Sequence, residues 1–76
     1  MDLVTMANEA ITNADRAIKD MSVLDRTRLI NSSYYMGQFH FIMGILEDED
    51  LDTFVKVFDE HKAIIDNIFT MQEATS

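Results

Sequence analysis

Residues 34–46, with the sequence YYMGQFHFIMGIL, form the most apolar stretch of the chain and decide the fold. Apolar side chains fall on almost every side of a helix drawn through this stretch, and such a helix must be covered on every side. The stretch is well short of the roughly 20 residues that cross a bilayer, and it contains Gln38 and His40. Two neighbouring helices from a chain of 76 residues can hardly cover it. We therefore expect a packed helix that is completed by a second chain.

The helix that contains this stretch is expected over residues 23–46. Ser22 is a suitable N-cap for it, with Asp25 three residues later in place of the usual Glu or Gln of a capping box. Gly37 and Gly44 lie seven residues apart inside the helix, where each costs about 1 kcal/mol relative to Ala. Close approach of another helix backbone is the expected reason for both glycines.

Two further helices are predicted, over about 3–20 and 51–71. The first has a narrow, alanine-rich stripe with apolar flanks, made of Leu3, Ala7, Ala10, Ala14, Ala17 and Met21 beside Val4, Ile11 and Ile18. Its opposite, solvated face is expected to hold Asn8, Thr12, Asp15 and Lys19. The third has a broad apolar face, made of Leu51, Phe54, Val55, Phe58, Ile65, Ile68 and Phe69, and a weaker one, made of Val57, Ile64 and Met71. Residues 72–76 are expected to fray.

The fold class is therefore all-α, a helical bundle formed by one domain over residues 1–76 and completed by oligomerisation. A chain this short buries a small core, and small folds usually need an additional constraint. Cysteine is absent, which rules out a disulfide and the usual zinc knuckle. Self-association is the expected alternative, through Tyr34, Gly37, Phe41, Gly44 and Ile64. The N-terminus lacks a basic region followed by an apolar core, so we expect no signal peptide and a cytoplasmic location.

The two halves of the chain differ in charge. Residues 39–76 carry nine acidic residues against Lys56 and Lys62, a net charge of −7, whereas residues 1–38 carry −1. Binding to nucleic acids or to anionic membranes needs clustered Lys and Arg, so neither partner is expected. A protein with a basic patch is the partner that this charge favours. The candidate surface for it is the acidic cluster of Glu47, Asp48, Glu49, Asp50 and Asp52.

Part of the acidic cluster also resembles a calcium-binding loop that would run from Asp48 to Asp59. Acidic residues occupy its first, third and fifth positions, but Thr53 stands at the sixth position, where Gly is needed, and Asp59 at the twelfth, where Glu is needed. The helical pattern that begins at Leu51 also argues against a loop. We interpret the acids as groups that complement a helix dipole, and we expect no metal or cofactor.

No arrangement of side chains suggests catalysis. His40 and His61 are too far apart in sequence for a local metal pair, and both are expected to be satisfied core groups. The serines lack an acid–base partner at a recognisable spacing. We therefore expect that the protein is not an enzyme.

Four of the six basic residues fall between residues 16 and 28, where two antiparallel helices would gather them at one corner. This basic corner, with the two adjacent tyrosines, consists of Arg16, Lys19, Arg26, Arg28, Tyr34 and Tyr35. One interpretation is a site for a phosphate-bearing nucleotide, with a tyrosine stacked on its base. The favoured interpretation is that the bases offset nearby aspartates and the helix dipole.

In size and composition the whole chain resembles small accessory proteins of bacteriophages, which are often short, acidic, free of cysteine and helical. The resemblance implies binding to a host component in the host cytoplasm. The leading hypothesis is thus a non-catalytic protein–protein interaction module, an inhibitor or adaptor that acts as a homo-oligomer. The alternatives are a sponge for a nucleotide second messenger, which would use the basic corner, and a structural assembly subunit.

Overall fold

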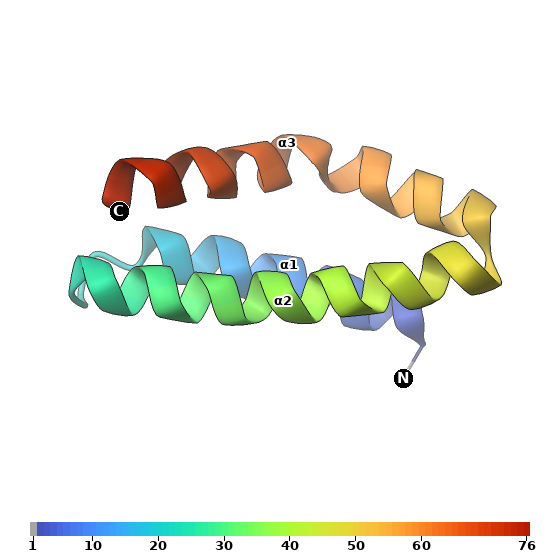
Figure 1. Ribbon diagram of the computed structural model, residues 1–76, viewed down its shortest axis with the longest axis horizontal. Helices are drawn as coiled ribbons and strands as arrows, with labels where there is room; N and C mark the ends of the chain where they lie inside the picture. The colour runs from blue at the N-terminus through green and yellow to red at the C-terminus, as the bar shows by residue number, and fades with distance from the viewer. Residues whose placement is uncertain (1) are drawn as a thin grey trace.

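The computed structural model describes residues 2–76, which form three helices joined by short turns (Figure 1). The helices are α1 (Leu3–Lys19), α2 (Asp25–Glu49) and α3 (Leu51–Thr75). The predicted all-α class is confirmed. The molecule is elongated, with principal extents of 38 × 22 × 14 Å, because α2 and α3 run along most of its length.

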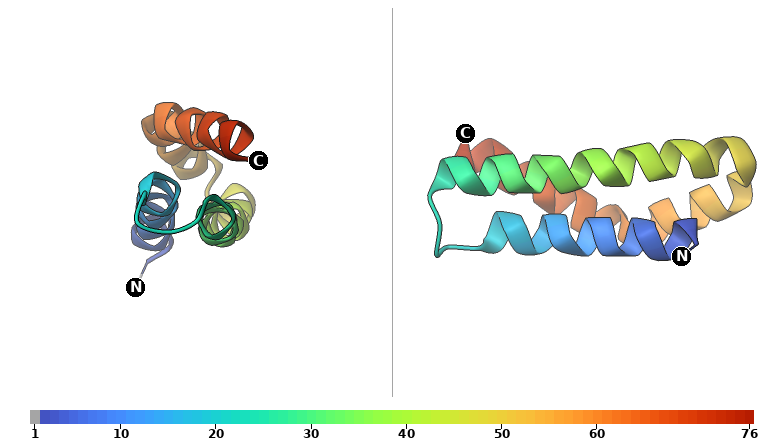
Figure 2. Two further views of the ribbon diagram at one scale, coloured as in Figure 1. Left: turned by 90° about the vertical axis from the view of Figure 1, so that its left-hand side faces the viewer. Right: turned by 90° about the horizontal axis from the view of Figure 1, so that it is seen from below.

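The three helices form a bundle in which α3 is set at an angle to the other two. The α1 and α2 helices lie side by side and antiparallel, and α3 returns antiparallel to α2 while crossing the pair obliquely (Figures 1 and 2). Seen end-on, the helices lie at the corners of a triangle (Figure 2). Of the buried apolar residues, α1 provides five, α2 four and α3 three.

The α1 helix packs through the predicted alanine-rich stripe. The carboxylate of Asp2 caps its first turn by accepting a hydrogen bond from the backbone N–H of Thr5, at 2.7 Å. The small side chains let α2 approach closely, and the fully buried group on this face is Ala7, Ala10, Ile11, Ala14 and Ile18. Met21 was expected in the stripe but lies beyond the helix end and is exposed, so its assignment was wrong.

The turn between α1 and α2 differs from the predicted one. The α2 helix begins at Asp25 rather than residue 23, after Leu24, which makes no side-chain cap. Ser22 is not the cap, because its backbone N–H donates to Oδ1 of Asp20 at 3.0 Å and its hydroxyl donates to the same oxygen. Asp20 follows the last residue of α1 and holds Ser22 in the turn.

The turn between α2 and α3 consists of Asp50 alone. The α2 helix continues to Glu49, three residues past its predicted end. The Asp50 carboxylate accepts hydrogen bonds from the backbone N–H and the hydroxyl of Thr53, which caps α3. Except for Asp50, the stretch that resembles a calcium loop is helical. Within residues 2–76 no group of three or more His, Cys, Asp or Glu side chains is arranged to hold a metal ion.

The face of α3 that packs on α1 and α2 matches the predicted broad face in part, because the buried residues Ile65 and Ile68 belong to that face and the buried Val57 does not. Val57, Ile65 and Ile68 are buried, whereas Phe58 and Phe69 are 40% and 49% exposed. Val57, which was assigned to the weaker face, belongs to the core. The oblique crossing of α3 turns the row that includes Val57 and Ile68 inward and leaves the larger aromatic rings toward solvent.

The end of α3 is helical to Thr75, so the predicted fraying of residues 72–76 is wrong. The side-chain amide of Gln72 donates to Oγ of Ser32 on α2 at 2.9 Å, and this oxygen belongs to a buried serine. The hydroxyl of Thr75 donates to the carbonyl of Met71 at 2.7 Å. The Gln72 bond ties the last turns to α2, and the Thr75 bond satisfies a polar group near the helix end.

Candidate protein-interaction surface

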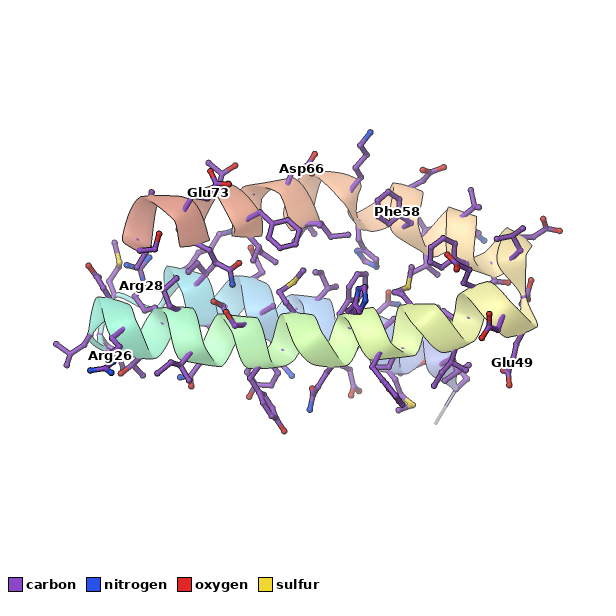
Figure 3. The ribbon with its side chains drawn as sticks, in the orientation of Figure 1. Arg26, Arg28, Glu49, Phe58, Asp66 and Glu73 are labelled. Atoms are coloured by element: carbon purple, nitrogen blue, oxygen red, sulfur yellow. The ribbon has the colours of Figure 1, made fainter. Side chains whose placement is uncertain are left out.

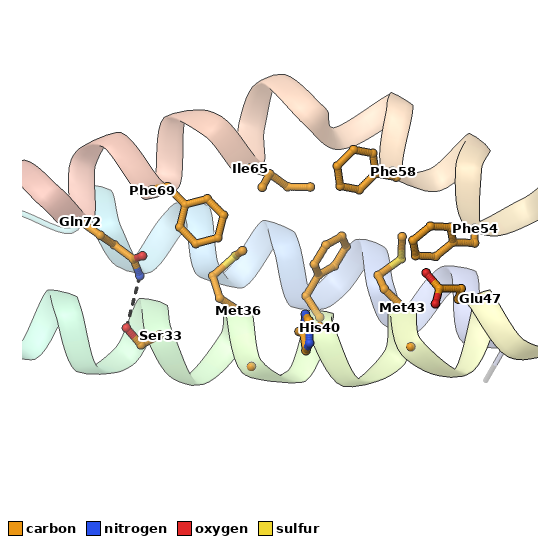
Figure 4. Close-up of a pocket in the computed structure, with 13 residues that line it drawn as sticks. Ser33, Met36, His40, Met43, Glu47, Phe54, Phe58, Ile65, Phe69 and Gln72 are labelled. Carbon is orange, nitrogen blue, oxygen red and sulfur yellow. Dashed lines mark hydrogen bonds between the residues drawn. The ribbon is translucent and has the colours of Figure 1, made fainter. Parts of the chain in front are cut away.

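An open groove with a volume of about 640 Å³ lies between α2 and α3 (Figure 4). Its walls are mainly apolar and come from both helices, namely Met36, Phe39 and Met43 on α2 and Phe54, Phe58, Ile65 and Phe69 on α3. Gln72 and Ser33 are joined by a hydrogen bond at one end, and Glu47 lies at the other (Figure 4). An apolar groove with polar ends has a shape that can accept the apolar face of a helix.

Gly37 and Gly44 border this groove on the α2 side. Apart from the adjoining residues and the nearby backbone of α2 itself, no atom of residues 2–76 lies within 4 Å of the position that a Cβ would occupy at either glycine. Packing within the chain therefore does not require a glycine at these positions, although each weakens the helix by about 1 kcal/mol relative to Ala.

The outer side of α2 is also apolar, and its margins border the groove at Gly37 and Gly44 and a shallow hollow against α1 at Phe41. Ile30, Tyr34 and Phe41 are 61%, 63% and 70% exposed. The Tyr34 ring meets only the edge of Tyr35 on its own helix, with ring centroids 5.3 Å apart. We call the set Ile30, Tyr34, Gly37, Phe41, Gly44 and Asp48 the outer ridge. It includes four of the five residues predicted for self-association, and the fifth, Ile64, lies on α3 outside the groove and is 38% exposed.

The acidic cluster lies at the end of the bundle where α2 meets α3. Glu49 projects there, and Arg26 lies at the opposite end of α2 (Figure 3). The two ion pairs found within residues 2–76 involve Asp15 and Asp25, so none of the cluster's carboxylates is paired with a base. Hydrogen bonds from the hydroxyl and then the backbone N–H of Thr53 lower the pKa of Asp50. The remaining four carboxylates of the cluster are exposed and face solvent.

The structure does not bring the whole basic corner onto one surface. Arg28 is buried, and its guanidinium donates to the carbonyl oxygen of Ile18 and to Asp25. Lys19 forms an ion pair with Asp15 at 3.0 Å on α1. Arg26 points away from the bundle while Arg28 points into it (Figure 3), and Arg16 lies in a shallow hollow along α1. A phosphate ligand would therefore meet separate cations rather than a cluster of four.

The two histidines have different environments. His40 is exposed in the groove, so its expected place in the core was wrong. His61 lies between helices, where Nε2 donates to Oδ1 of Asn8 at 2.6 Å and the ring meets Phe39 edge-on. Its Nδ1 is buried without a hydrogen-bond partner among residues 2–76. Asn8 was assigned to the solvated face of α1, and no sequence spacing signals a contact between residues 53 positions apart.

The groove, the outer ridge and the acidic cluster thus lie next to one another along α2. None of the helices within residues 2–76 is long and apolar enough to cross a membrane. Comparisons with protein-family models, with curated proteins and with solved structures give no match to this chain.

Proposed function

We propose that this protein is a non-catalytic interaction module that uses α2 to bind a second copy of itself and a basic partner protein. The observation that carries the proposal is that large apolar side chains remain exposed in two places along α2, namely Ile30, Tyr34 and Phe41 on the outer ridge, and Phe58 and Phe69 of α3 across the groove. An exposed apolar patch with a polar rim commonly marks a binding surface of a protein. The outer ridge and the groove share only Gly37 and Gly44, so self-association through the ridge leaves the apolar walls of the groove for the partner.

The partner that fits the groove is an amphipathic helix with basic residues. The apolar walls, which include Met36, Met43 and Phe69, match the apolar face of such a helix. Glu47 at one end of the groove and the acidic cluster beyond it match Lys or Arg on the helix. Attraction between these charges would speed association at low salt and weaken as salt rises.

The cellular setting belongs to the same proposal. A short acidic chain that captures a basic helix would act as an inhibitor or adaptor of the protein that carries the helix, in the cytoplasm of a host cell. This part is supported by the chain's composition and by its likeness to phage accessory proteins.

A direct test uses a fluorescent synthetic helix of Leu and Lys, about five turns long, titrated with the protein. We expect fluorescence anisotropy to show saturable binding that weakens from low to physiological salt. Removing a groove wall with Phe69→Ser should weaken binding by about tenfold, the equivalent of about 1.4 kcal/mol. The ridge variant Phe41→Ser is the matched control, since it removes the same ring outside the groove.

The charge requirement is tested with a double reversal. The double variant Glu49→Lys with Asp52→Lys should weaken binding of the basic peptide. The control is Asp59→Lys with Glu60→Lys in α3, which changes the net charge by the same amount away from the acidic cluster. This control should weaken binding less. If the Phe69→Ser variant and the Glu49→Lys, Asp52→Lys variant both bind the peptide as tightly as the wild type, the groove is not the binding site. Tighter binding of a Leu and Glu peptide than of the Leu and Lys peptide would also contradict the proposal.

A further inference from the structure

The outer ridge has the spacing of a coiled-coil seam. Its residues, Ile30, Tyr34, Gly37, Phe41, Gly44 and Asp48, follow one another in alternating steps of four and three. Seams of this spacing normally face a partner helix. Here the large members are more than half exposed, and the two glycines face open space in the single chain.

We propose that two copies pair through antiparallel α2 helices around a two-fold axis at the level of residue 39. This inference rests on the self-association proposed above and specifies its geometry. In this register Phe41 lies against Gly37 of the partner subunit, and Tyr34 lies against Gly44 of the partner subunit. Ile30 lies against Asp48 of the partner subunit at each edge, and the same contacts recur by symmetry.

The sizes of the side chains favour this register. Each aromatic ring of one α2 enters the space that a glycine leaves on the other, which gives the even packing that helix interfaces need. A parallel pair in register would set Phe41 against Phe41 of the partner subunit and Gly37 against Gly37 of the partner subunit. Such a pair would be crowded at one level and would leave a void at the next. The antiparallel register thus explains why Gly37 and Gly44 lie on an exposed helix face without an intrachain reason.

The charges favour the same direction. Arg26 lies one turn before Ile30 at the start of α2, is exposed, and forms no ion pair within residues 2–76. In the antiparallel pair it comes within reach of Asp48 of the partner subunit, which lies opposite Ile30 one turn away. The helix dipoles also oppose one another favourably. A parallel pair would instead place the acidic ends of both α2 helices together.

Because the chain has no cysteine, the register can be tested with single introduced cysteines. Ile30→Cys and Asp48→Cys are prepared separately with tags of different mass, mixed, and oxidised mildly. In the proposed pair these positions face one another, whereas two copies of either position lie about 27 Å apart along the helix. A disulfide needs Cα atoms within roughly 7 Å. We expect a mixed disulfide as the main product and an almost complete loss of cross-linking when either variant is oxidised alone.

The alternative results are distinct. Self-linked Ile30→Cys and self-linked Asp48→Cys would indicate a parallel pair and overturn the register. No cross-link in any mixture, together with a dimer mass by light scattering, would place the self-interface elsewhere and overturn the inference while leaving the proposed self-association intact. A monomer mass for the wild type would overturn both. Ile30→Cys mixed with Phe41→Cys is the register control, and these should link poorly because they lie about 10 Å out of step.

Discussion

The guanidinium of Arg28 donates from Nε to the carbonyl oxygen of Ile18 across a distance of 2.8 Å, and Nη2 donates to the same oxygen. The carbonyl belongs to the last turn of α1, which has no partner for it within the helix. Nη1 also donates to Asp25 at 3.1 Å, so the side chain links the end of α1 to the start of α2. A base that the sequence assigned to a ligand corner is therefore part of the connection between two helices.

Replacing Arg28 should destabilise the fold. Arg28→Lys keeps the charge but cannot donate two bonds to the Ile18 carbonyl, so we expect the free energy of unfolding to fall by about 1–3 kcal/mol. Urea denaturation followed by circular dichroism measures this change. Arg26→Lys, at an exposed position two residues away, is the control and should change the monomer's stability little. Equal effects at both positions would mean that the buried contact does not contribute.

The packed face of α3 can be tested with two adjacent residues. Ile68 is fully buried, and Ile68→Ala should cost about 2–5 kcal/mol of unfolding free energy. Phe69 is the larger side chain but is half exposed, so Phe69→Ala should cost less. The comparison is made by urea denaturation at a low protein concentration. A larger loss at Phe69 than at Ile68 would show that α3 packs through the side that carries its aromatic rings rather than through the side that carries Ile68.

How much the sequence could predict differs between α1 and α3. The alanine stripe of α1 is narrow and has one clear direction, so its packed face was predictable. The α3 helix has apolar residues on two sides, and the choice between Val57 and Phe58 depends on an oblique crossing that no local pattern records. The close approach of another helix that the sequence predicted at Gly37 and Gly44 is not seen within the described chain and stays a prediction about a second copy. The burial of Arg28 was not predictable, because its partner lies ten residues away.

Acidification should lower the free energy of unfolding, because three aspartates near the helix ends lose their charge. Hydrogen bonds lower the pKa of Asp2, Asp20 and Asp50 below the ordinary value of 3.8, from Thr5, Ser22 and Thr53 respectively. A carboxyl group whose pKa is lower in the folded state contributes stability that is fully present above its unfolded pKa. That contribution is lost as the pH falls through the folded value. We therefore expect stability to decline below about pH 4.

The contribution of Asp50 is isolated by Asp50→Asn, which keeps an acceptor for Thr53 but cannot titrate. Circular dichroism between roughly pH 5 and pH 2 should show a shallower loss of stability in this variant than in the wild type. An identical pH profile would mean that the Asp50 carboxylate is not held by Thr53 in solution.

A larger side chain at Gly37 should weaken self-association without destabilising the fold. A Cβ at position 37 would meet no neighbouring element, so Gly37→Leu should raise the helix stability of the monomer by up to about 1 kcal/mol. The same side chain would occupy the space proposed for Phe41 of the partner subunit and should weaken the dimer. Asn31→Leu places the same side chain at an exposed position outside the outer ridge and should leave the dimer intact. A Gly37→Leu protein that dimerises as well as the wild type would show that this glycine does not lie at the interface.

Sedimentation equilibrium of the wild type across a concentration series tests self-association through α2 most directly. At tens of micromolar the mass should be twice the chain mass of 8.8 kDa, and it should decrease on dilution because association depends on concentration. Phe41→Ser should shift the mass toward 8.8 kDa at the same concentration without loss of helicity. A stably folded wild type that stays at 8.8 kDa throughout the series would contradict the proposal.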